Sequence, residues 1–264
     1  MTRTTSTTPF FAALVAFVAA GAAARAAEPG GREIAQRVEE QNRSNTEIST
    51  FEMRIVDGKG KEKVRRIKSF SSTPKGGQDR VMLRFLDPPD VAGTGLLTLE
   101  GSPEDEQWIY LPAQKRTRRI AAGGKNESFM GSDLSYDDLR PRDVDAWEYK
   151  VLRSEKLPDG DTWVLEAVPV KGGKAADSEY GRTLSWIRKE DFVPLKGELY
   201  DKDGQLWKAI AYAGYKDDGG VKRPASLSVE NRKKGSKTVM SYVERAINTP
   251  IDDGVFTARS LEAP

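Results

Sequence analysis

The 264-residue sequence contains no histidine and no cysteine. Without these side chains there is no Ser-His-Asp or Cys-His pair for nucleophilic catalysis. The usual nitrogen and sulfur ligands of zinc, copper and haem are also missing. Chemistry at neutral pH would depend on carboxylates, lysine or tyrosine, or on a hard metal held by oxygen. We therefore expect a protein that is not an enzyme and that uses no catalytic residue, metal or cofactor.

The lack of cysteine has two further consequences. It excludes disulfide bonds, so core packing and sheet hydrogen bonds must stabilise the fold unaided. A bacterial lipoprotein also carries its lipid on a cysteine directly after the cleavage site, and we accordingly expect no lipid anchor.

Long apolar runs are scarce as well. Phe10–Ala20 is one such run, and it follows a polar start that carries Arg3. Ala24-Arg25-Ala26 then offers small residues around a cleavage site. The run is too short for a membrane span, which needs about 20 apolar residues, and the arrangement is typical of a secretory signal. We predict a signal peptide at residues 1–26, a single domain at residues 27–264, and the periplasm as its compartment.

Neither charge is in clear excess. The chain has 42 Lys and Arg against 40 Asp and Glu, and removal of Arg3 and Arg25 with the signal leaves 40 of each. A neutral protein of mixed charge has no general attraction for nucleic acid. We expect no nucleic-acid partner.

Short alternating runs dominate the sequence from Thr50 onward. FEMRIV at Phe51, VMLRFL at Val81 and TWVLEAV at Thr162 each place apolar residues on one face. Alternation is typical of half-buried strands, whereas residues 32–43 have the spacing of an amphipathic helix. The pattern predicts a mainly β fold with about ten or eleven strands, most of them antiparallel, and one or two short helices.

Turn residues separate these runs. Asp-Gly pairs occur five times, and Asp-Gly suits hairpin turns because both central positions can take positive φ. We predict one hairpin around Asp203-Gly204 and a second that turns near Lys234-Gly235.

The most informative stretch extends from Trp108 to Leu139. It joins an apolar strand, WIYL, to a basic cluster at residues 115–119 and then, after glycines, to a segment that begins apolar at Phe129. In WIYL the aromatic residues point to one face and the aliphatic residues to the other. We expect both faces of the sheet to be covered there.

The basic cluster, KRTRR, has two interpretations. It could bind phosphate-bearing headgroups or an acidic partner, because the arginine fork suits phosphate and carboxylate. It could also be a solvated strand edge, where positive charges discourage aggregation.

Residues 129–139 also allow two interpretations. They could form a lid, with Gly131 permitting a sharp entry, Ser132 or Asp133 capping a short helix, and Met130 contacting varied acyl chains. They could equally be an ordinary loop that fills the core. The three acidic residues of this segment are Asp133, Asp137 and Asp138. Acids in turns are more often caps or solvated than metal ligands, so we expect no metal there.

Together these motifs resemble the outer-membrane lipoprotein-sorting protein family. That family has a W-[LI]-Y-L-P-A strand, an R-R-I run and an F-M-G-S-D-[FL]-[ST]-Y-[ED]-D-L segment in this order. Here they stand at residues 108–113, 118–120 and 129–139. YGRTLSWIRKEDFVPLKGELYDKDGQLWK from Tyr180 and IDDGVFTARSLE from Ile251 extend the likeness over nearly all of the mature chain.

The resemblance implies an antiparallel sheet curved into an unclosed β-barrel with a helical lid over its mouth. It implies a periplasmic carrier that binds acyl chains of a lipoprotein or lipid in an apolar cavity and moves them toward the outer membrane. The donor would be an inner-membrane transporter of the resistance-nodulation or ATP-binding-cassette kind, and the acceptor would lie at the outer membrane. Arg118 and Arg119 would contact headgroups or partners, and the carrier would be a monomer.

We expect acyl chains to contact the apolar strand faces, the lid and some of the tryptophans. The predicted lipid-binding residues are Phe51, Met53, Ile55, Val81, Leu83, Phe85, Trp108, Tyr110, Phe129, Met130, Leu134, Leu139, Trp163, Leu165 and Trp186.

The sequence also allows two alternative functions. A lipid-sensing regulatory module on the same fold would bind the lipid without transferring it. A carboxylate-based glycan hydrolase would need two acids about 5–10 Å apart in a cleft, and no feature of the sequence nominates such a pair.

Overall fold

The computed structural model describes residues 28–41, 43–74, 76–101, 105–140 and 142–262. The signal peptide predicted for residues 1–26 lies outside these ranges. Within them, no helix combines the length and the apolar character that crossing a membrane requires.

In the described ranges, thirteen strands form one antiparallel sheet in the order β6-β5-β4-β3-β2-β1-β15-β14-β11-β10-β9-β8-β7. One half of the sheet comprises β1 (Thr46–Val56), β2 (Glu62–Ser72), β3 (Arg80–Asp87), β4 (Gly95–Leu99), β5 (Glu106–Leu111) and β6 (Arg116–Arg119). The other half comprises β7 (Trp147–Leu157), β8 (Gly160–Pro169), β9 (Tyr180–Arg188), β10 (Pro194–Asp201), β11 (Leu206–Ala213), β14 (Ser226–Asn231) and β15 (Ser236–Ile247). A separate hairpin pairs β12 (Lys216–Asp218) with β13 (Val221–Arg223).

The prediction of a mainly β, unclosed architecture is confirmed. The strands β6 and β7 end the sheet, and among the described residues they do not pair with each other. The fifteen strands of the described ranges outnumber the predicted ten or eleven, in large part because the short strands β6, β12 and β13 have no apolar alternation. The helix α1 (Gly31–Gln41) agrees with the helix predicted at residues 32–43, and α2 (Ala258–Leu261) is a single turn.

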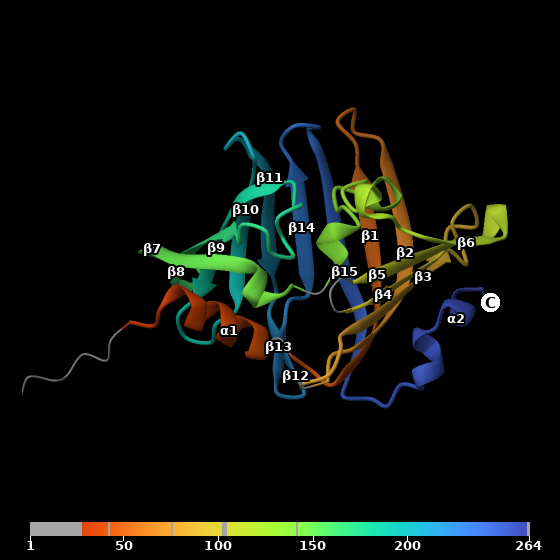
Figure 1. The fold of residues 1–264 in the computed structure, drawn as a ribbon, viewed down its shortest axis with the longest axis horizontal. Helices are drawn as coiled ribbons and strands as arrows, with labels where there is room; N and C mark the ends of the chain where they lie inside the picture. The colour runs from red at the N-terminus through yellow and green to blue at the C-terminus, as the bar shows by residue number, and fades with distance from the viewer. Residues whose placement is uncertain (1–27, 42, 75, 102–104, 141, 263–264) are drawn as a thin grey trace, which may run out of the picture.

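The order of the strands determines the course of one long connection. The chain begins in the middle of the sheet at β1 and proceeds outwards to the edge strand β6. It resumes at the opposite edge with β7 and then returns strand by strand until β15 pairs with β1. Residues 120–146 therefore have to cross from one edge of the sheet to the other. Figure 1 shows this connection, in yellow-green, over the strands in the centre of the molecule.

Alternate strand residues build the main core on the face that this connection covers, which we call the inner face. In β1 the inward residues are Phe51, Met53 and Ile55, and in β3 they include Leu83 and Phe85. Each of the five is at most 6% exposed. Since side chains of a strand alternate between faces, a period of two in the sequence produces this continuous apolar surface.

The C-terminal segment covers part of the opposite, outer face. The turn η6 (Asp253–Phe256) and α2 carry Phe256 and Leu261, which pack against Leu97 of β4. The last residues of the sequence that the structure describes thus bury a second apolar layer on the outside of the sheet.

The strand β5 is consequently buried on both faces. Ile109 belongs to the inner core, whereas Trp108 and Tyr110 pack against the outer cluster beneath α2. The two-sided burial expected from WIYL is thus present.

The helix α1 covers the β7–β9 end of the inner face. Its residues Ile34 and Ala35 pack against Trp163 and Leu165 of β8 and against Ile187 of β9. The inner face is therefore covered by α1 at one end and by the long connection in its centre.

Candidate functional site

Residues 129–140, which we call the covering segment, lie on the inner face of the sheet. Phe129 is 1% exposed, and its ring centre lies 5.7 Å from that of Phe85 and 5.6 Å from that of Tyr136. Leu134 is buried in the same cluster, and Leu139 packs against it. The segment therefore shields from water the apolar surface that the strands would otherwise expose.

The covering segment is built from short turns. It contains the 3-10 turns η3 (Phe129–Gly131) and η4 (Asp137–Leu139). Met130 and Gly131 have φ of 51° and 77°, and this left-handed pair reverses the chain. Gly131 thus provides the sharp bend that the sequence predicted. The helical lid expected from the resemblance takes the form of 3-10 turns, because the segment is too short and too bent for a regular α-helix.

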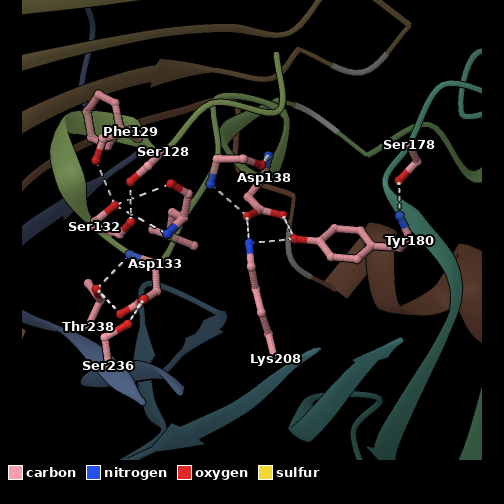
Figure 2. Close-up of polar contacts among 12 residues, drawn as sticks. Ser128, Phe129, Ser132, Asp133, Asp138, Ser178, Tyr180, Lys208, Ser236 and Thr238 are labelled. Atoms are coloured by element: carbon pink, nitrogen blue, oxygen red, sulfur yellow. Dashed lines mark hydrogen bonds and ion pairs between the residues drawn. The ribbon is translucent and has the colours of Figure 1, made fainter. Parts of the chain in front are cut away.

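Hydrogen bonds within the covering segment give it a fixed local shape. The backbone N–H of Phe129 donates to Leu134 O at 2.7 Å. The hydroxyl of Ser132 donates to Phe129 O at 2.8 Å, and Ser128 Oγ donates to Ser132 O at 2.5 Å. Figure 2 shows these contacts gathered in one tight turn.

Asp133 fastens the covering segment to β15. Its side chain is buried, and its carboxylate accepts hydrogen bonds from Ser236 Oγ at 2.5 Å and from Thr238 Oγ1 at 2.8 Å. Its backbone N–H donates to Thr238 Oγ1 at 2.9 Å. In Figure 2 both hydroxyl groups point up from the strand toward Asp133. The carboxylate is therefore held by two neutral hydroxyl donors.

Asp138 fastens the segment to β11, which lies in the same half of the sheet as β15. Lys208 Nζ of β11 lies 2.8 Å from Asp138 Oδ2 and 2.6 Å from the hydroxyl of Tyr180, which donates to Asp138 Oδ1 at 2.8 Å. Lys208 is 3% exposed. Asp138 also caps its own turn, since its Oδ2 accepts from the N–H of Ser135 at 2.8 Å. Burial raises the pKa of Tyr180, and the nearby Asp138 carboxylate raises it further.

Contacts with β2 and β5, and with residue 105 just before β5, complete the attachment. Arg65 donates to the backbone oxygen of Met130, and Gln107 Nε2 donates to Tyr136 O at 2.9 Å. Arg140 forms an ion pair with Asp105 at 2.6 Å, and both side chains are largely buried. Polar contacts with strands from both halves of the sheet therefore hold the segment over an apolar surface.

A cavity of about 520 Å³ lies beside the covering segment, and we call it the main cavity. Its apolar walls consist of Leu134, Ala146, Trp147, Ala175, Leu199, Ile210, Leu227 and Val229. The Lys208–Asp138–Tyr180 group borders it, and further charged residues such as Arg140 and Arg142 lie along it. The cavity combines these apolar walls with eleven charged side chains and several polar ones, so a ligand would meet both kinds of surface.

A second cavity of about 240 Å³, the side pocket, lies between α1 and the sheet. Its apolar walls consist of Ala35, Val38, Val144, Tyr149, Leu165, Ala167 and Ile187. Asp79 lines it, and Arg43 lies 3.8 Å from Asp79 Oδ1, too far for a hydrogen bond. Burial raises the pKa of Asp79 to about 6, although Arg43 opposes the shift.

The structure brings most of the predicted lipid-binding residues together on the inner face. Ten belong to or pack against the main core: Phe51, Met53, Ile55, Val81, Leu83, Phe85, Phe129, Met130, Leu134 and Leu139. Trp163 and Leu165 lie under α1, and Leu165 lines the side pocket.

Three predicted residues lie on the outer face, where they cannot line either cavity. Trp108 and Tyr110 pack beneath the C-terminal segment. Trp186 packs with Val164 and Leu184 on the outer side of β8 and β9. The prediction placed them inward because alternation separates the two faces of a strand without saying which face is the inner one.

Arg118 and Arg119 lie on the edge strand β6 and point to opposite faces. Arg118 stands opposite Ile109 in the strand register, and Arg119 stands opposite Trp108. Arg119 forms an ion pair with Glu106 at 3.0 Å, in which both side chains are substantially exposed. The structure thus does not bring the two arginines together into one site.

Sequence reasoning missed Lys208, Tyr180 and Arg142. Lys208 could have been found from the run LWKAIAYA, because it lies on the same strand face as Ile210 in a mainly apolar sequence. A charged residue at an inward position requires a buried partner. Tyr180 and Arg142 carry no comparable signal, since their roles depend on contacts with distant strands.

A model of a family described as an uncharacterized protein matches residues 77–263. No curated protein matches the sequence.

Solved structures give closer comparisons. A domain named as an outer membrane lipoprotein-sorting protein, from Vibrio parahaemolyticus, is 30% identical, with a TM-score of 0.82 over 88% of this chain and 98% of that one. A DUF1329 family protein from Desulfovibrio piger is also 30% identical, with a TM-score of 0.83 over 88% and 97% of the two chains. A LolA superfamily protein from Nitrosomonas europaea shares the fold at 20% identity and a TM-score of 0.69, over 87% and 98%.

Proposed function

We propose that this chain, which belongs to the outer-membrane lipoprotein-sorting protein family, binds acyl chains of a lipoprotein or lipid inside its half-barrel and carries them between membrane partners. The observation that carries the proposal is the covering segment. It places an apolar surface under a cover held by polar contacts, directly beside the apolar walls of the main cavity.

The energetics favour an acyl ligand. Each buried CH₂ group contributes roughly 0.8 kcal/mol, so a chain of about 14 carbons gains on the order of 10 kcal/mol before ordering costs. The main cavity of about 520 Å³ falls within the range of roughly 300–1,000 Å³ found for small-molecule sites. Displacement of the covering segment would add the inner surface of β1–β5 to this space.

The covering segment also gives the carrier a way to release its load. Phe129 and Leu134 occupy the apolar surface when no ligand does, so they compete with an acyl chain for the same contacts. The polar attachments at Asp133 and Asp138 re-form when the segment closes. Each such hydrogen bond contributes about 0.5–1.5 kcal/mol, and together they lower the net affinity enough to allow transfer.

The remaining parts of the proposal concern location and partners. We propose that the mature chain is a monomeric, single-domain protein of the periplasm. An inner-membrane transporter would supply the ligand, and an acceptor at the outer membrane would receive it. This role requires no catalytic residue, metal or cofactor.

Native mass spectrometry of the protein purified from its own periplasm tests the proposal. A co-purifying lipid or acylated protein is the expected result. A chain that is always empty, and that takes up no labelled lipid from vesicles, would exclude both the carrier and the lipid-sensing module. Transfer of labelled lipid to acceptor vesicles then separates these two functions, because only a carrier delivers its ligand.

A further inference from the structure

Arg142 lies where the two cavities of the inner face meet. It lines both the main cavity and the side pocket. On β9, Thr183 lines the main cavity, and Ser185, the next residue on the same face, lines the side pocket. Arg142 Nη2 donates to Thr183 Oγ1 at 3.2 Å. Its guanidinium is therefore held at the boundary between the two spaces.

The positive charge of the Arg142 guanidinium is not neutralised by an ion pair within the described residues. No carboxylate of the part of the chain that the structure describes lies within ion-pair distance of it. Its Cζ atom lies 4.7 Å from the ring centre of Trp147, which orients the side chain. The residue is exposed, so an anionic group can reach it from solvent.

Several neighbouring charges along the main cavity form ion pairs with one another. The pairs are Arg140–Asp105 at 2.6 Å, Lys208–Asp138 at 2.8 Å and Lys174–Asp143 at 3.4 Å. These pairs remove three cations as competitors for an anion and neutralise three acids that would repel one. Arg142 and Lys125 remain as lining cations without an ion pair among the described residues, and of these two only Arg142 also lines the side pocket.

We infer that the ligand is a two-tailed lipid with a phosphate in its headgroup, with the phosphate on Arg142 and one tail in each cavity. This inference rests on the proposed function and names the class of lipid. The arginine fork bonds phosphate oxygens in a bidentate manner. A two-tailed lipid carries its phosphate close to the point where its tails diverge, and Arg142 stands where the two apolar spaces diverge.

The side pocket is suited to the second tail. Val38 of α1 faces Leu165 and Ala167 of β8 across it, and none of the three carries a polar side-chain atom. A ligand with a single tail would leave this pocket without an apolar occupant. The sheet and α1 thus form a second site with an apolar wall that is independent of the covering segment, and Glu39, Arg43 and Asp79 lie along the same pocket.

Binding of two lipids with identical tails tests the role of Arg142. The probes are dioleoylphosphatidylglycerol and dioleoylglycerol, which lacks the phosphate, and each is titrated into the full chain. Arg142→Gln should weaken binding of the phospholipid about tenfold, because a charge-assisted contact is lost, and should leave dioleoylglycerol unaffected. Arg116→Gln on the exposed edge strand β6 removes the same charge and should change neither. Equal loss for both lipids in the Arg142 variant, or no loss, overturns the inference.

A second variant tests the assignment of the second tail. Val38→Phe narrows the side pocket and should weaken dioleoylphosphatidylglycerol several-fold, while lysophosphatidylglycerol, which has one tail, binds as before. An unchanged circular dichroism spectrum establishes that the variant is folded. Equal effects on the two phospholipids contradict a tail in the side pocket.

The outcomes for the unmodified protein separate this inference from the proposed function. Uptake of a triacylated peptide without uptake of either phospholipid would leave the carrier role intact and overturn the inference. Failure to bind any acyl-bearing probe would overturn both.

Discussion

Lys208 Nζ lies 2.8 Å from Asp138 Oδ2, and this contact joins the centre of β11 to the covering segment. The two residues are 70 positions apart in the sequence, and their side chains are 4% and 12% exposed. The ion pair borders the main cavity. It therefore fixes the segment to the sheet at the border of the main cavity.

Lys208→Met should loosen the covering segment and destabilise the protein. Removing one partner of a buried pair leaves the other charge uncompensated and costs about 3 kcal/mol. Urea unfolding measures the loss, and trypsin cleavage at Lys125, in the connection that leads to the segment, should become faster.

A double variant tests whether the destabilisation comes from the unpaired charge of Asp138. Lys208→Met combined with Asp138→Asn removes the orphaned charge, so it should be less destabilised than Lys208→Met alone. Lys202→Met in the exposed β10–β11 turn changes the same charge and should have little effect. A double variant no more stable than the single one would contradict the assigned role of the pair.

Asp79 predicts a pH dependence of stability. Burial raises its pKa from 3.8 to about 6 in the folded protein, so the folded state binds this proton more tightly than the unfolded state does. Protonated Asp79 contributes fully to the stability of the folded state below about pH 4. This contribution is lost as the pH rises from about 4 to about 6, and above that the buried carboxylate destabilises the folded state. Asp79→Asn should therefore gain stability relative to the unmodified protein as the pH rises. Urea unfolding at pH 4.5 and 7.5 measures this difference, and a difference independent of pH would refute the assignment.

Leu134→Asp tests the covering segment as part of the lipid site. Leu134 is 8% exposed, belongs to the main core and lines the main cavity. A carboxylate there should impair lipid uptake, because it places a charge against the apolar walls. Strand content by circular dichroism should be unchanged. Leu152→Asp, at an exposed position on the edge strand β7, is the matched control and should bind lipid normally. Unaltered uptake by the Leu134 variant would remove the segment from the mechanism.

The strands and turns of this fold were predictable because their signals are local. The hairpins expected at Asp203-Gly204 and Lys234-Gly235 are present, as the β10–β11 and β14–β15 pairs. Gly204 and Gly235 take the positive φ that such turns require. A period of two likewise grouped the apolar residues of β1 and β3 that share one face, because side chains of a strand alternate between its faces.

The arrangement of the site was less predictable because it depends on long-range contacts. Trp108 and Trp186 were expected in the cavity, but the outer face of this sheet also buries aromatic residues. No local pattern in a strand distinguishes an inner face from an outer face that is covered. The pairing of Lys208 with Asp138 also could not be predicted. It requires the long connection to cross the inner face of the sheet, and this crossing follows only from the order of the strands.

Gly131→Ala tests whether the covering segment competes with the ligand. Gly131 has φ of 77°, and a Cβ there would meet no atom within 4 Å, so the substitution adds backbone strain without a clash. An L-residue in the left-handed region costs about 1–2 kcal/mol, and the cost is borne by the closed state. If the segment and the lipid exclude each other, weakening the closed state should raise the apparent lipid affinity about fivefold or more. Gly123→Ala, in the same connection but without positive φ or a nearby atom, should leave the affinity unchanged. An affinity that falls or stays constant in the Gly131 variant would mean that the segment forms part of the binding surface and does not have to move.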